Sequence, residues 1–204
     1  MPPIPVNLAV EDAVSEAVVR RLLDIVNRDY AARTIYNRGG FGYLKKNIIG
    51  FNNAAKGTPF LVLTDLDASP CPSALIANWL PHPKRHNLLL RVAVKEVEAW
   101  LLADRYGISK YLGIRTEEVP ANPESLADAK KSLVQLACKS PRKEIKRDIC
   151  PPAGSTRQVG PNYTGQLTLF IVRYWDPNAA KINALSLDRT INRLMAFQPT
   201  WQQN

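Results

Sequence analysis

The residues of this sequence best suited to chemistry are two aspartates at the end of an apolar run. Asp65 and Asp67 follow the aliphatic segment 60–64, which is typical of a buried strand in a parallel sheet. Such strands present ligand-binding residues at their carboxyl ends. If the extended backbone continues past residue 64, alternate residues point the same way and the two carboxylates lie together.

Two carboxylates held this close repel each other. At a separation of about 4 Å and an effective dielectric constant near 20, the repulsion amounts to roughly 4 kcal/mol. A divalent cation or a shared proton is the usual way to relieve it. We therefore predict a metal site, with Mg²⁺ or Mn²⁺ as the expected ion, because Mg²⁺ prefers carboxylate oxygen and water as ligands.

A further acid is expected at the same edge of the sheet. Glu11 follows the apolar segment 6–10, which predicts a first strand, and three acids from two strand ends can converge on one or two ions. Glu16 lies about one turn into the helix that Asp12 is expected to cap. Glu16 can reach the same metals, or it can pair with Arg20 on the solvated face of that helix.

The third acidic cluster again follows a predicted strand, at residues 88–94. If the backbone stays extended, Glu96 and Glu98 share a face; if a helix has begun, they point roughly 200° apart and only one can face the site. We interpret Trp100 as a core residue and Asp104 as the end of the helix that follows.

The order of the predicted elements indicates an α/β fold with a mainly parallel sheet flanked by helices, because strands alternate with helices. We expect this core to span residues 1–112, followed by a helical and basic C-terminal part, 113–204. The expected strands are 6–10, 34–36, an Asp-bearing strand in the stretch 60–67 that follows Pro59, and 88–94. The expected helices are 14–26, 43–55, 71–80, 97–105, 125–137, 165–173 and 187–197. Residues 150–163 are rich in Pro, Gly, Ser and Arg and predict a long loop.

The composition narrows the class of protein. A chain of 204 residues with 46% hydrophobic residues is long and apolar enough for a substantial folded core. It has no apolar run of membrane-spanning length and no secretory leader, so we expect neither membrane insertion nor secretion. The three cysteines lack metal-ligand spacing and fit a reducing cytoplasm in which they have no thiol role.

The formal net charge of +9 favours a polyanionic ligand that approaches a metal, although solubility alone is the simpler explanation. The segment 139–147 can equally be the solvated face of a helix. We interpret His82 and His86 as surface residues because their spacing does not suit zinc. The candidate nucleic-acid contacts are Lys84, Arg85, Lys139, Arg142, Lys143, Lys146, Arg147 and Arg157.

In this order the acidic motifs resemble the Toprim domain of primases, topoisomerases and overcoming-lysogenization-defect nucleases. The opening at residues 10–12, the Asp65-Leu66-Asp67 motif and the run Glu-Val-Glu-Ala-Trp-Leu-Leu-Ala-Asp at 96–104 resemble, more closely, a bacterial Toprim-like family. Members of that family often accompany ATPases in phage-defence loci. The resemblance covers most of the chain, and its specific motifs lie between residues 6 and 104.

By this resemblance, Glu11 is a metal ligand or an acid/base, and the two aspartates hold Mg²⁺. Glu98, with Glu96 as its rival, completes the second metal site, and Lys95 stabilises charge on the phosphate.

The chain also departs from the nuclease pattern, which has a glycine after the first glutamate and a second acid four residues on. Here Asp12 follows Glu11, and Glu16 lies five residues on. This difference leaves open a domain that no longer cleaves.

The chemistry implied by the resemblance is two-metal phosphodiester hydrolysis, which makes the chain a nuclease and an effector of phage defence or of a toxin system. The chain has no phosphate-binding Gly-x-x-x-x-Gly-Lys-Ser/Thr motif, so any ATPase is a separate subunit. The alternatives are a non-catalytic subunit that binds nucleic acid or an ATPase, and a haloacid-dehalogenase-like phosphatase in which Asp65 is the nucleophile and Asp67 its acid/base. A glycosyltransferase that uses Asp-x-Asp is less favoured in so short a chain.

Overall fold

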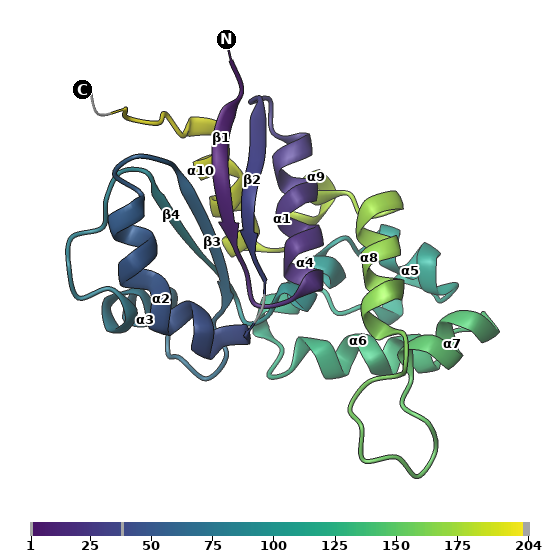
Figure 1. Ribbon diagram of the computed structural model, residues 1–204. Coiled ribbons are helices and arrows are strands. Elements are labelled where there is room, and N and C mark those ends of the chain that lie inside the picture. Colours follow the sequence, from purple (N-terminus) through teal and green to yellow (C-terminus); the bar gives the residue numbers. More distant parts are fainter. Residues whose placement is uncertain (1, 38, 202–204) are drawn as a thin grey trace. The chain divides into compact units, whose positions relative to one another are not determined.

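A computed structural model describes residues 2–37 and 39–201, which form two compact units (Figure 1). The first comprises Met1–Val94 and Arg189–Asn204, and the second is Lys95–Asp188. We call them the sheet unit and the helical unit. This division differs from the one expected at residue 112, because the segment after Val94 packs among helices of its own unit and the last helix returns to the sheet.

The sheet unit confirms the predicted α/β fold. In the described part of the chain, four parallel strands form one sheet in the order β2-β1-β3-β4. The aliphatic runs that predict strands do form them, and the second strand is longer than expected. The strands are β1 (Ile4–Ala9), β2 (Tyr30–Tyr36), β3 (Phe60–Asp65) and β4 (Leu88–Ala93).

Helices cover both faces of this sheet, as parallel strands require. Buried residues of β3 and β4, among them Val62 and Leu90, pack in one apolar cluster with Leu44 of α2 and Trp79 of α3. Figure 1 shows α1 on the side of the sheet away from α2. The helices of this unit are α1 (Ala13–Ile25), α2 (Gly40–Ala54), α3 (Pro72–Trp79) and most of α10 (Leu185–Ala196).

The core of the helical unit is built around two tryptophans. Trp100 and Trp175 are fully buried, and the Trp175 indole N–H donates to the carbonyl of Trp100 at 3.2 Å. Every residue of α4 is buried, in line with the prediction that Trp100 is a core residue. The elements are α4 (Val97–Ala103), α5 (Arg105–Leu112), η1 (Thr116–Glu118), η2 (Pro123–Ser125), α6 (Ala129–Cys138), α7 (Lys143–Ile149), α8 (Tyr163–Arg173) and α9 (Pro177–Ala180).

The predicted helix 97–105 is divided at Asp104. This residue ends α4, as predicted, and its carboxylate accepts the backbone N–H of Gly107 at 2.9 Å, which caps α5. Residues 151–162 form neither helix nor strand, in agreement with the expected loop. Among the described residues, no helix is both long and apolar enough to cross a membrane.

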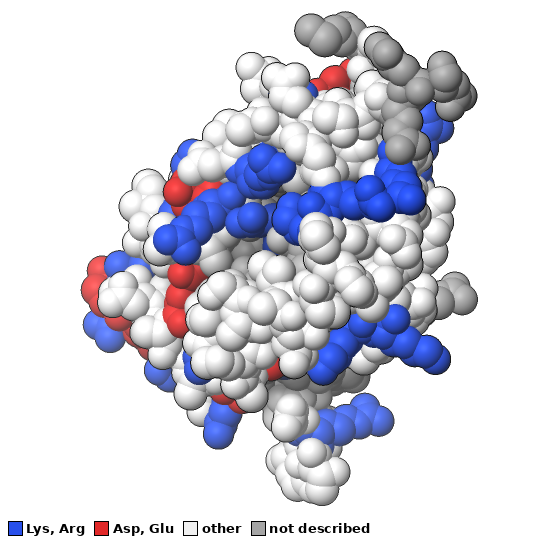
Figure 2. Space-filling view, turned by 90° about the vertical axis from the view of Figure 1, so that its left-hand side faces the viewer, with Lys and Arg blue, Asp and Glu red and all other residues white. Residues whose placement is uncertain are grey.

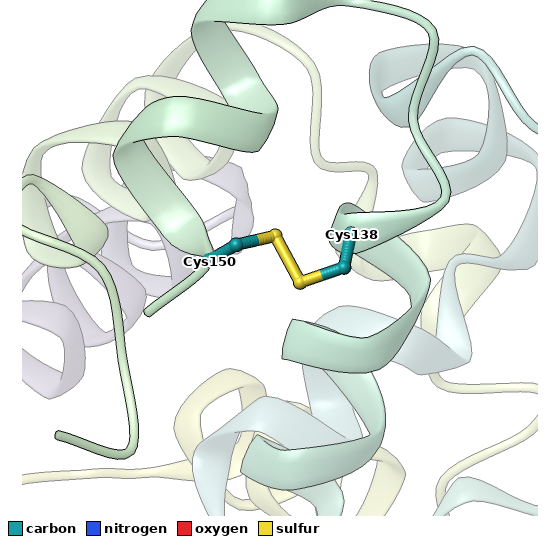
Figure 3. Close-up of a disulfide and its surroundings, with 2 residues drawn as sticks. All are labelled: Cys138 and Cys150. Atoms are coloured by element: carbon teal, nitrogen blue, oxygen red, sulfur yellow. A yellow bond between two sulfur atoms is a disulfide. The ribbon is translucent and has the colours of Figure 1, made fainter. Parts of the chain in front are cut away.

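Cys138 and Cys150 form a disulfide in the helical unit, with their Cα atoms 5.6 Å apart (Figure 3). The bond links the end of α6 to the residue after α7, across a sequence separation of 12 residues. Cys71 takes no part in a disulfide. The expectation that the cysteines have no thiol role is therefore wrong for Cys138 and Cys150. The odd number of cysteines and their spacing in the sequence did not indicate this disulfide.

We expect the disulfide to stabilise the helical unit by about 3 kcal/mol, because it restricts the unfolded chain. The double variant Cys138→Ser/Cys150→Ser should unfold at lower urea concentration than the wild type, and a reductant should destabilise the wild type but not this variant. Cys71→Ser is the matched control and should behave as the wild type does. A wild-type unfolding curve unchanged by reductant would contradict the prediction.

Candidate functional site at the carboxyl edge of the sheet

The strand order places a topological switch point between β1 and β3. From β1 the chain crosses to β2 on one side, whereas β3 and β4 lie on the other side. In open α/β sheets, ligands bind outside the carboxyl ends of the strands at such a point. Glu11 follows β1 and Asp65 ends β3, so the two acids lie on either side of the switch point.

Hydrogen bonds from the neighbouring strand hold Glu11 in place. Its Oε1 atom accepts the Thr64 hydroxyl at 2.6 Å and the Asp65 backbone N–H at 2.9 Å. Burial raises the pKa of Glu11, these two bonds oppose the rise, and the negative charges of Asp67 and Asp12 add to it. The structure therefore brings Glu11 to the end of β3, within electrostatic range of Asp67.

The two aspartates of the Asp-x-Asp motif differ in backbone conformation. The strand ends at Asp65, Leu66 is buried, and Asp67 is an exposed turn residue with a φ angle of +47°. The extended geometry that would point both carboxylates the same way does not continue past Asp65. A non-glycine residue in the left-handed region carries backbone strain, which is common at functional sites.

The other two acids near β1 have local partners. Asp12 caps α1, as predicted, by accepting the Ser15 N–H at 2.8 Å. Glu16 pairs with Arg20 at 2.8 Å and accepts a hydrogen bond from Asn37. The pairing is the alternative that the sequence left open for Glu16.

The third acidic cluster belongs to the helical unit and has its contacts there. Glu96 is the extended residue before α4 and accepts the backbone N–H of Lys130 at 2.8 Å. Glu98, in the first turn, accepts the Tyr163 hydroxyl at 2.8 Å and lies 3.4 Å from the Lys130 ammonium. The helix begins at Val97, so Glu98 already lies in its first turn, and both carboxylates contact Lys130. Lys95 is a half-buried residue just before them.

The pKa of Glu98 leads to a prediction about how the stability of the protein depends on pH. Burial raises this pKa, whereas Lys130 and the Tyr163 hydroxyl oppose the rise. A raised native pKa means that the folded state binds the proton more tightly, so the stability contributed by Glu98 falls as pH rises above its ordinary value of 4.5. Glu98→Gln keeps an acceptor for Tyr163 and buries no charge, so its unfolding free energy should fall less than that of the wild type between about pH 5 and about pH 8.

The measurement is urea unfolding at both pH values, with Glu144→Gln as the control because Glu144 is an exposed acid of the same unit. Equal pH dependence of the wild type and Glu98→Gln would show that Glu98 does not titrate differently in the folded protein.

All eight basic residues predicted to contact nucleic acid are exposed. In the helical unit, Lys139 pairs with Glu118 at 3.5 Å, and Arg147 with Asp148 at 2.8 Å. Hydrogen bonds from Arg147, Gln166 and Asn162 lower the pKa of Asp148 to about 2. Among the described residues, the side chains of Lys143, Lys146 and Arg157 have no ion-pair partner. These three are the better candidates for a polyanion.

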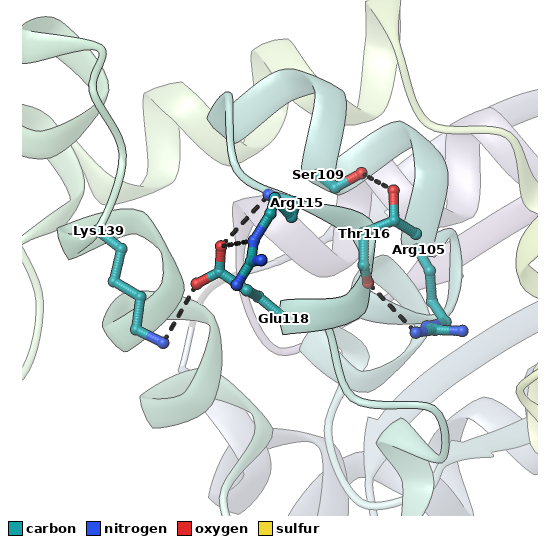
Figure 4. A network of polar contacts seen from close by, with 6 residues as sticks. All are labelled: Arg105, Ser109, Arg115, Thr116, Glu118 and Lys139. Carbon is teal, nitrogen blue, oxygen red and sulfur yellow. Dashed lines mark hydrogen bonds and ion pairs between the residues drawn. The ribbon is translucent and has the colours of Figure 1, made fainter.

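Figure 4 shows how Lys139 is engaged. Glu118 lies between Lys139 and Arg115, and it also accepts the backbone N–H of Arg115 at 3.3 Å. In the same network Arg105 donates to the carbonyl of Thr116 at 3.2 Å. The network connects η1 with α5 and with the end of α6, and Glu118 is the partner of Lys139 in it.

The side chains at the carboxyl edge suit a hard divalent cation as ligands, because Glu11, Asp65 and Asp67 offer carboxylate oxygens. The Oε1 atom of Glu11 accepts two hydrogen bonds, and no described residue donates to Oε2. No group of three or more His, Cys, Asp or Glu residues that could hold a metal is assembled within the described ranges. Sequence reasoning missed Thr64, whose signal is a lone hydroxyl in an aliphatic strand next to the first aspartate.

The fold and site define the protein as an α/β protein with carboxylates at the switch point of a parallel sheet. Comparisons with models of protein families, with curated proteins and with solved structures found no match for this chain.

Proposed function

We propose that the protein binds Mg²⁺ or Mn²⁺ at the carboxyl ends of β1 and β3 and hydrolyses phosphodiester bonds of nucleic acid. The observation that carries the proposal is the contact of Glu11 with Thr64 and the Asp65 N–H across the switch point. The resemblance of the acidic motifs to Toprim-like nucleases supports the same chemistry.

Each residue of the edge has a role in this proposal. Asp65 and Asp67 hold the cation, with Glu11 as a further ligand or as the acid/base. The Thr64 hydroxyl and the Asp65 N–H fix one oxygen of Glu11, which leaves Oε2 to contact the metal or to exchange a proton. A bound divalent cation would supply an activated water and stabilise the leaving oxygen.

The charge of the chain favours nucleic acid as the substrate. The formal net charge is +9, and exposed Lys and Arg side chains gather on the face drawn in Figure 2. Backbone phosphates are the ligands that such side chains bind without regard to sequence, and binding of this kind weakens as salt rises. By the same resemblance, we propose action in the cytoplasm beside a separate ATPase, in phage defence.

A second candidate is a domain of the same kind that binds nucleic acid or an ATPase without cleaving. Specific contacts favour it. Glu98 is 2% exposed, and its carboxylate accepts a hydrogen bond from Tyr163 and pairs with Lys130. Glu96 accepts a backbone N–H. Glu16 is likewise paired with Arg20. A second metal site that relies on these carboxylates would have to break the contacts they make.

The test is cleavage of plasmid DNA, single-stranded DNA and total tRNA with Mg²⁺, Mn²⁺ or EDTA. Wild type is compared with Asp65→Ala and with the control Asp24→Ala, an exposed acid of α1. Metal-dependent cleavage that Asp65→Ala loses and Asp24→Ala keeps would support the enzyme and identify its substrate. Cleavage that persists in Asp65→Ala would overturn the site, and no cleavage by a protein that binds nucleic acid would favour the second candidate.

A further inference from the structure

Four basic residues of the sheet unit gather where β4 meets α10. We call Lys84, Arg91, Arg189 and Arg193 the β4–α10 basic cluster. β4 is an edge strand of the sheet, and Lys84 precedes it by a few residues. Arg189 and Arg193 are four residues apart on α10, a spacing that places them on the same face of the helix.

Arg91 links the strand to the helix. Its neighbours Leu90 and Val92 pack in the apolar cluster with α2 and α3, so Arg91 lies on the opposite face of β4. There its Nε atom donates to the Thr190 hydroxyl of α10 at 3.2 Å. The bond uses one nitrogen and leaves the two terminal nitrogens of the guanidinium for another ligand.

Among the residues that the structure describes, no acid forms an ion pair with the four residues of the cluster. Burial lowers the pKa of Arg91, and the neighbouring charges that add to the effect are those of Arg193 and Arg189. Burial also lowers the pKa of Lys84, with further contributions from Arg193 and Arg91. Like charges brought together in this way raise the free energy of the folded protein unless an anion binds between them.

The C-terminal end of α10 does not account for the cluster. Cations near a helix C-terminus are favourable because free carbonyls carry partial negative charge. Here Arg28 already donates to the carbonyl of Phe197 at 2.6 Å, and Tyr30 donates to that of Leu194 at 2.7 Å. Arg189 lies in the first half of the helix, where a positive charge gains nothing from the dipole.

We propose that the β4–α10 basic cluster binds backbone phosphates of nucleic acid, so that the sheet unit holds its polyanion at the β4 edge. Arginine suits this role because its planar group donates two hydrogen bonds to one phosphate. Arg85, which the sequence predicts together with Lys84 as a nucleic-acid contact, follows Lys84 in the segment before β4. The choice of nucleic acid rests on the proposed function, whereas the anion site rests on the cluster itself.

The test is binding of a short fluorescein-labelled DNA duplex, followed by anisotropy in EDTA so that cleavage plays no part. Arg189→Gln/Arg193→Gln should bind about tenfold more weakly, and the dependence of log affinity on log salt should flatten by about 0.9 for each lost phosphate contact. The matched control is Lys45→Gln/Lys46→Gln, which removes two exposed charges from α2 on the other face of the sheet. It should bind within about twofold of the wild type.

Thermal unfolding with and without inorganic phosphate provides the second measurement. Phosphate should raise the melting temperature of the wild type more than that of Arg189→Gln/Arg193→Gln, because it binds only the folded cluster. Equal loss of DNA binding in both double variants, or an equal effect of phosphate on the wild type and the arginine variant, would overturn the proposal. Because the binding assay is run in EDTA and the phosphate assay needs no substrate, a failed cleavage assay and a failed test of the basic cluster are distinguishable.

Discussion

Glu11→Gln is expected to lower metal-dependent hydrolysis by about 10²- to 10⁴-fold while the protein stays folded. The glutamine carbonyl can still accept the Thr64 hydroxyl and the Asp65 N–H, so the contact between the ends of β1 and β3 is retained. What is lost is the negative charge and the ability to exchange a proton. The measurement is the initial rate of cleavage at saturating metal, together with a urea unfolding curve.

Glu117→Gln is the matched control, because Glu117 is exposed. It should leave both the rate and the unfolding curve unchanged. The unfolding free energy of Glu11→Gln should be no lower than that of the wild type, because the amide has no charge to desolvate. A rate equal to that of the wild type in Glu11→Gln would remove Glu11 from the proposed chemistry.

Trp100→Ala is expected to destabilise the protein by about 3–5 kcal/mol, a large part of the 5–15 kcal/mol that typical domains possess. The side chain is fully buried, and its indole N–H donates to the Ser186 hydroxyl at 2.7 Å. The substitution leaves a cavity in the core of the helical unit and removes the hydrogen bond from the indole to Ser186. Urea unfolding followed by circular dichroism measures the loss.

Tyr106→Ala removes an aromatic ring that is 69% exposed in the same unit, and it should change the unfolding free energy by less than about 0.5 kcal/mol. If Trp100→Ala were no more damaging than this control, Trp100 would not be part of a packed core. The motif at residues 96–104 would then need an interpretation other than a role in the core of the helical unit.

The sheet and part of the site could be predicted because their causes are local. Aliphatic runs form β1, β3 and β4, and Asp12 caps α1 as the spacing indicates. Since parallel strands end at the same edge, the approach of Glu11 to the end of β3 followed from the order of the motifs.

The rest depends on partners that are remote in sequence or on backbone geometry. Tyr163, which binds Glu98, lies 65 residues away, so no spacing rule connects them. The turn that gives Asp67 its positive φ begins just after Asp65, where periodicity predicts only that the strand goes on. The basic cluster at Arg91 requires a strand and a helix 99 residues apart to meet, as its bond to Thr190 shows.

Direct titration of Mn²⁺ tests the central claim, that carboxylates at the ends of β1 and β3 hold a divalent cation, without the need for a substrate or an activating partner. The account predicts that the wild type binds Mn²⁺, with Mg²⁺ as a competitor. Asp65→Asn/Asp67→Asn should lose this binding, whereas Asp24→Asn should keep it. No binding by the folded wild type, or equal binding by Asp65→Asn/Asp67→Asn, would contradict the account.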